Sequence, residues 1–170
     1  LFLGFSLPSA VLLLTAFNLT NGISRLASGV LSDRYGRRRV MSLAFMASAL
    51  AYLALPLAEG LLTCAILAAV VGFSFGTLFS VSAPLVADCF GLEHFGAIFG
   101  LAFAAYGFVS GPLGPTLSGY LLDITGNNYA LVFLYLSLFS LMASISILHV
   151  LPPEGSCGPI STLKWECFLF

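Results

Sequence analysis

Long apolar runs separated by short polar turns set the pattern of this 170-residue chain. A helix needs about 20 apolar residues to cross a bilayer, and only helices satisfy their own backbone hydrogen bonds in lipid. We therefore predict five membrane-spanning helices joined by short connections. The predicted spans are residues 7–32, 39–57, 61–87, 95–122 and 129–151.

Composition favours lipid over water as the surrounding solvent. Hydrophobic residues make up 59% of the chain and charged residues 8%, whereas a soluble domain carries roughly a quarter charged residues. We expect an all-α integral membrane protein with the lipid bilayer as its first partner. Residues 1–151 would form the transmembrane bundle, which Pro152 and Pro153 end. Residues 152–170 would be a cytoplasmic tail that is unstructured or lies at the interface.

Basic residues are concentrated in one place. Five of the six Lys and Arg residues lie between Arg25 and Arg39, four of them in an arginine-rich turn at residues 33–39. A dense cationic loop between two apolar runs is typical of the cytoplasmic side of a multi-pass membrane protein. The turns at 56–60 and 123–128 contain no Lys or Arg, so we expect them to face outward. The basic cluster is too short to favour nucleic-acid binding, and none is expected.

Arg25 is the one basic residue that lies well inside a predicted span, about 10 Å from its cytoplasmic end. Asn18, Asn21, Arg25 and Gly29 recur at helical spacing and form a polar stripe on an apolar helix. An intramembrane Arg is costly and faces a cavity or a partner, and a guanidinium binds a carboxylate through two contacts. We therefore predict a substrate site at Arg25, Asn21 and Asn18. The alternative is that Arg25 extends to the headgroups or braces neighbouring helices.

Glycine and proline interrupt the fourth run at Gly111, Pro112, Gly114 and Pro115. Proline removes a backbone donor and bends a helix. Interrupted helices in transporters mark places where the bundle flexes or lines a cavity, so we predict helix flexing at these residues. A purely architectural kink is the alternative. Glycine pairs at 72 and 76 and at 96 and 100 predict close helix packing.

Catalytic patterns do not occur in the chain. It has no GxSxG, HExxH or phosphate-loop motif and no paired carboxylates within a span. Asp88 and Asp123 fall at helix ends, where capping is the expected role. We expect no enzyme activity, no catalytic residue, no metal site and no cofactor.

The residues from Gly29 to Arg39 read Gly-Val-Leu-Ser-Asp-Arg-Tyr-Gly-Arg-Arg-Arg. This stretch resembles the signature loop of the major facilitator superfamily, Gly-x-Leu-x-Asp-Arg-x-Gly-Arg-Arg. In that family the loop is a cytoplasmic latch, so the resemblance implies gating rather than substrate contact. The gating residues would be Asp33, Arg34, Gly36 and Arg37.

Later motifs are similar to those of monocarboxylate-transporter-like members of the superfamily. Asp88-Cys-Phe-Gly91 resembles the stretch between their helices ten and eleven, and Gly114-Pro115 resembles part of the end of helix eleven. These relatives also carry an Arg shortly before the signature loop, where Arg25 lies. The resemblance implies helices eight to twelve, part of the C-terminal six-helix half-bundle. Since the chain starts within an apolar run, we expect the partner N-terminal half-bundle upstream.

The function implied by the resemblance is secondary transmembrane transport of a small, monocarboxylate-like organic anion by alternating access. Many monocarboxylate transporters place an acid where this chain has Asn21, so a coupling proton is left open. The stretch around Arg25 also resembles oxalate/formate antiporters, but residues 95–122 contain no counterpart of their helix-eleven lysine. The alternatives are an efflux carrier for a larger metabolite and a truncated membrane protein that does not transport. A plasma membrane and an organelle membrane both fit.

Overall fold

The computed structural model describes residues 7–126 and 128–150, and this part of the chain is all helical, which confirms the predicted fold class. The tail predicted at 152–170 and the end of the last predicted span at Leu151 lie outside the described residues. In chain order the elements are α1 (Leu7–Tyr35), α2 (Arg37–Ala54), the 3-10 turn η1 (Leu55–Leu57), α3 (Leu61–Phe90), α4 (Phe95–Ala105), the π-helical turn η2 (Tyr106–Ser110), α5 (Gly111–Ile124) and α6 (Tyr129–His149).

Five helical segments of this part are long and apolar enough to cross a membrane, with α2 and η1 forming one of them and α4, η2 and α5 another. Their outer surfaces carry large apolar side chains, among them Leu26 with 80% and Phe108 with 85% of its surface exposed. An apolar surface this extensive is stable only against lipid or another apolar partner. The described helices therefore have the exterior of a membrane bundle.

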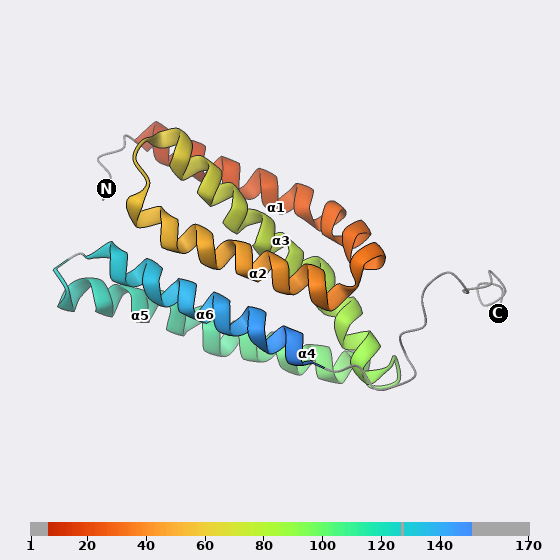
Figure 1. Ribbon diagram of the computed structural model, residues 1–170. Helices are drawn as coiled ribbons and strands as arrows, with labels where there is room; N and C mark the ends of the chain where they lie inside the picture. Colours follow the sequence, from red (N-terminus) through yellow and green to blue (C-terminus); the bar gives the residue numbers. More distant parts are fainter. Residues whose placement is uncertain (1–6, 127, 151–170) are drawn as a thin grey trace.

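The helices lie in two groups that meet along α2 and α6 (Figure 1). α1 packs along the length of α3, and α2 packs against α3 on one side and α6 on the other. The span formed by α4, η2 and α5 contains no buried residue in its most apolar stretch. One surface of the bundle is thus incompletely covered by the described residues.

Two glycines allow the backbones of α1 and α3 to approach closely. A Cβ atom on Gly72 would collide with the backbone at Phe17, and one on Gly76 would collide with Ser24 Oγ and the backbone of Asn21. Only glycine permits this spacing, because any side chain would push the helices apart. The close packing that the sequence predicts for this glycine pair is confirmed.

The glycine pair of α4 behaves differently. A Cβ atom on Gly96 or Gly100 would meet no atom within 4 Å. Within residues 7–126 and 128–150, therefore, this pair does not mediate the predicted helix contact. Both glycine pairs have a four-residue spacing, but only the pair of α3 packs against another helix, because the glycines of α4 do not face a described helix.

Serine pairs join α2 to α6. Ser42 and Ser144 lie with their hydroxyl oxygens 2.9 Å apart, and Ser48 and Ser140 lie 2.6 Å apart. All four side chains are buried. Hydrogen bonds of this kind hold helices together in lipid, where no hydrophobic force does so.

The fourth span is interrupted immediately before its prolines, as their positions predict. The amide of Gly111 donates to the carbonyl of Tyr106, five residues back, and closes a π-helical turn. Pro112 has no amide hydrogen and lies in the first turn of α5, where none is needed. Pro115 lies inside α5 and removes a further backbone donor. Regular α-helical bonding is therefore broken between α4 and α5.

Candidate functional site

The arginine-rich turn joins α1 to α2 through a single glycine. Gly36 has a φ of 91°, a conformation that L side chains rarely adopt. Its amide donates to the Ser32 carbonyl at 3.0 Å, and its carbonyl accepts from the Val40 amide at 3.2 Å. This one residue therefore ends one helix and begins the next, which fixes the arginines that follow it.

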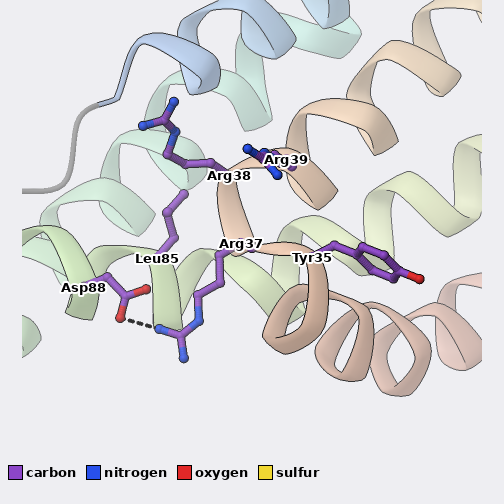
Figure 2. A pocket seen from close by; sticks show the side chains of 7 residues that line it. Tyr35, Arg37, Arg38, Arg39, Leu85 and Asp88 are labelled. Atoms are coloured by element: carbon purple, nitrogen blue, oxygen red, sulfur yellow. Dashed lines mark hydrogen bonds and ion pairs between the residues drawn. The ribbon is translucent and has the colours of Figure 1, made fainter. Parts of the chain in front are cut away.

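Arg37 connects the first turn of α2 to the last turn of α3 (Figure 2). Its Nη1 atom is ion-paired with Asp88 and also donates to the Pro84 carbonyl at 3.0 Å. Both charged side chains are about three-quarters shielded, with 27% and 28% of their surfaces exposed. Asp33 lies 3.8 Å from Nη2 of the same guanidinium but is 62% exposed, so its attraction is weaker.

Asp88 thus has a partner that the sequence does not reveal. Helix capping was its expected role, whereas the structure pairs it with Arg37, 51 residues earlier. The available signal was an acid at the end of the third run, because spans that alternate in direction return this end to the side of the arginine-rich turn. Asp88 joins the candidate gating residues because of this pairing.

The remaining arginines of the turn have different surroundings. Arg38 donates from Nη2 to the Leu148 carbonyl at 2.8 Å and so satisfies the end of α6. Arg34 and Arg39 are exposed and form no ion pair with any described residue. A hollow of about 420 Å³ lies among Arg37, Arg38, Arg39, Leu85 and Asp88. Tyr35 also lines this hollow, and its ring points away from Asp88 (Figure 2).

Arg25 lies on the exposed side of α1 with one of its predicted partners. Its Nε donates to Asn21 Oδ1 at 3.3 Å, one helical turn earlier. The guanidinium carbon lies 5.4 Å from the centre of the Phe79 ring on α3, within cation–π range. Among residues 7–126 and 128–150, Arg25 has no ion-paired carboxylate. Its charge is held by neutral groups.

Asn18 and Gly29, the other members of the predicted polar stripe, do not contact the Arg25 side chain. Asn18 donates from Nδ2 to the Leu14 carbonyl at 2.9 Å, so its amide group is bonded to its own helix. Gly29 faces α3, where a Cβ atom would lie 3.5 Å from Ser80 Oγ. Ser80 donates to the Arg25 carbonyl at 2.8 Å and ties the two helices together at this level. The structure thus brings Arg25 and Asn21 together but not Asn18.

Aromatic rings surround Phe79, the residue whose ring lies against the Arg25 guanidinium. Phe79 lies with its ring centre 5.1 Å from Phe75, 5.9 Å from Phe103 and 6.2 Å from Tyr106. Phenylalanines spaced four residues apart on α3 and α4 were the sequence signal, but such spacing is equally typical of lipid-facing helices. The aromatic cluster beside Arg25 is therefore a feature that only the structure reveals.

The glycines and prolines of the fourth span lie next to this cluster in sequence. Tyr106, the first residue of η2, contacts Phe79, and the π-helical turn runs from it to the residues predicted to flex. Those residues, Gly111, Pro112, Gly114 and Pro115, all lie in the first turns of α5.

Metal chemistry has no candidate here: the described part of the chain contains no group of three or more His, Cys, Asp or Glu side chains placed to hold an ion.

Comparison with known proteins agrees with this architecture. The family described as Major Facilitator Superfamily matches residues 2–162. Monocarboxylate transporter 13 of Rattus norvegicus is 32% identical over 164 residues, which cover 95% of this chain and 38% of that protein. An MFS-type transporter of Gibberella moniliformis (strain M3125 / FGSC 7600) is 32% identical over 127 residues, which cover 74% of this chain and 30% of that protein.

The chain spans less than two fifths of the length of these curated relatives. No solved structure matches it significantly. The family match extends over almost the whole chain and includes the signature-like turn and all the described helices. The chain therefore belongs to the Major Facilitator Superfamily and is a multi-pass membrane protein.

Proposed function

We propose that this chain forms part of a secondary carrier for small organic anions and that Arg25 binds the substrate carboxylate. The observation that carries the proposal is the exposed guanidinium on a membrane-spanning helix, bonded to the neutral Asn21 and paired with no described carboxylate. A cation without a counter-ion is costly within a membrane span, so a site of this kind is stabilised by a bound anion. The name of the monocarboxylate transporter relative supports the same substrate class.

Within this proposal Asn21 orients the guanidinium, and Asn18, one turn earlier on α1, adds a polar side chain to the substrate path. The five spans correspond to helices eight to twelve of a twelve-helix carrier, and a second half-bundle closes the site. Rocking of the two halves then exposes Arg25 to each side of the membrane in turn. A coupling proton is not part of the proposal, because Asn21 does not titrate.

Gating is assigned to four residues of the arginine-rich turn and to Asp88 on α3. Asp33, Arg34, Gly36 and Arg37, together with Asp88, would form a latch on the cytoplasmic side. The shielded Arg37–Asp88 pair supports this role, since an ion pair at the ends of two helices has two discrete states, made and broken. The π-helical turn supports flexing at Gly111, Pro112, Gly114 and Pro115, because such turns are already locally irregular.

Uptake measurements test the substrate class. The protein is expressed from its complete coding sequence, purified and reconstituted in liposomes, and uptake of labelled propionate is followed. We expect saturable uptake that other short carboxylates inhibit and bulky neutral amphiphiles do not. Inhibition by the amphiphiles alone would instead identify an efflux carrier for larger metabolites. No uptake of either class would contradict transport by this protein.

A further inference from the structure

A small apolar hollow lies between α3 and α4, next to the candidate substrate site. Its volume is about 160 Å³, and aromatic side chains form much of its wall. Phe79 contributes from α3, Phe99 and Phe103 from α4, and Tyr106 from η2. The ring centres of Phe99 and Phe103 are 4.5 Å apart, and those of Phe79 and Tyr106 are 6.2 Å apart at an interplanar angle of 88°.

Phe79 belongs to the hollow and to the surroundings of Arg25 at once. The guanidinium carbon of Arg25 is 5.4 Å from the centre of this ring, and the same side chain lines the hollow. Phe79 is therefore the one described side chain that both contacts the guanidinium and lines the hollow. A positive charge beside an apolar hollow is complementary to a molecule that has an anionic end and an apolar end.

The volume of the hollow selects the size of the apolar group. A cavity of about 150 Å³ lined by apolar side chains holds one benzene molecule. The hollow between α3 and α4 is of this size, and its rings already meet at tilted and edge-on angles that accept a further ring. The one- to three-carbon groups of the smallest carboxylates would leave most of it empty.

A polar atom in the wall is also unsatisfied. Ser82 lines the hollow, and its Oγ is shielded from solvent without a hydrogen-bond partner among the residues that the structure describes. Buried hydroxyl groups are usually hydrogen-bonded. The Ser82 hydroxyl does not open onto the hollow, so the wall that a bound group would meet is apolar.

We propose that the hollow between α3 and α4 is the side-group subsite of the carrier and that the preferred substrates are aryl-substituted carboxylates. The inference rests on the proposed function, in which Arg25 binds the carboxylate. A phenyl ring would occupy the space bounded by Phe79, Phe103 and Tyr106, while the carboxylate meets the guanidinium. Burial of one aromatic ring favours such a substrate over its unsubstituted parent by about 10–100-fold.

The test compares propionate with 3-phenylpropionate as inhibitors of labelled-propionate uptake by the reconstituted protein. We expect 3-phenylpropionate to inhibit at a concentration about 10–100-fold lower. Ala102→Phe places a ring in the hollow and should remove this preference, whereas Ala104→Phe, on the same helix but outside the hollow, should keep it. Val86→Phe fills the hollow from α3 and serves if Ala102→Phe does not reach the membrane.

The outcomes distinguish failure of the aryl subsite from failure of the proposed anion transport. Propionate uptake with equal inhibition by both acids would overturn the aryl subsite while leaving anion transport intact. A phenyl preference that survives in Ala102→Phe and Val86→Phe would show that the ring binds outside the hollow, and would also overturn it. Absence of all carboxylate uptake would remove the proposed function and this inference with it.

Discussion

Replacing Arg25 with glutamine is expected to lower carboxylate uptake by about 100-fold, equivalent to about 2.7 kcal/mol. Glutamine keeps much of the side chain's length and can still bond to Asn21, but it carries no charge to pair with a carboxylate. Lysine keeps the charge without the planar fork, so Arg25→Lys should retain part of the activity and show mainly a raised KM. Uptake at equal protein density in reconstituted liposomes is the measurement.

Arg39→Gln is the matched control, because Arg39 is exposed and forms no ion pair with any residue in the described ranges. It should transport like the unaltered protein. Unchanged uptake in Arg25→Gln would exclude Arg25 from substrate binding and leave it a structural role, supported by its contacts with Asn21 and Phe79.

Asp88→Asn is expected to slow uptake by about tenfold and to lower the thermal stability of the detergent-solubilised protein. The change removes the negative charge beside Arg37 and leaves the more distant Asp33 as its acidic neighbour. A charge-assisted hydrogen bond, of a kind worth about 1.5–3 kcal/mol, becomes a weaker neutral one. Asp33→Asn is the matched control. It should have a much smaller effect on stability, because its carboxylate is 62% exposed and 3.8 Å from Arg37.

A double variant separates gating from simple bracing. If Arg37 and Asp88 act as one latch, Arg37→Gln with Asp88→Asn should cost little more uptake than either change alone. Additive losses, or a larger loss from Asp33→Asn than from Asp88→Asn, would contradict the assignment of Asp88 to the latch.

Features of the fold that depend on local sequence were predictable. Apolar runs of sufficient length became helices because lipid leaves the backbone no alternative, and the prolines of the fourth run produced an interruption just before Pro112. The contact between Arg25 and Asn21 follows from their spacing of one helical turn. In each case the interacting groups lie within five residues of one another, so the pattern alone brings them together.

Contacts between helices were not predictable in the same way. Spacing shows which residues share a face but not which neighbour that face meets, so the glycines of α3 pack closely while those of α4 do not. Asp88 and the Phe79 cluster gain their partners from other helices, as do the serine pairs of α2 and α6. An apolar sequence with few charges contains little information on such pairings, because most side chains suit several neighbours.

Substrate protection of a cysteine beside Arg25 tests the central claim most directly. Gly22 lies one turn before Arg25 and is exposed, and a Cβ atom added to it would meet no atom within 4 Å, so Gly22→Cys fits without strain. In a protein whose native cysteines, including the four of this chain, are replaced by serine, propionate at about ten times its inhibition constant should slow alkylation of this cysteine about tenfold. Arg25→Gln should abolish the protection. An alkylation rate that is the same with and without the anion would contradict binding at Arg25.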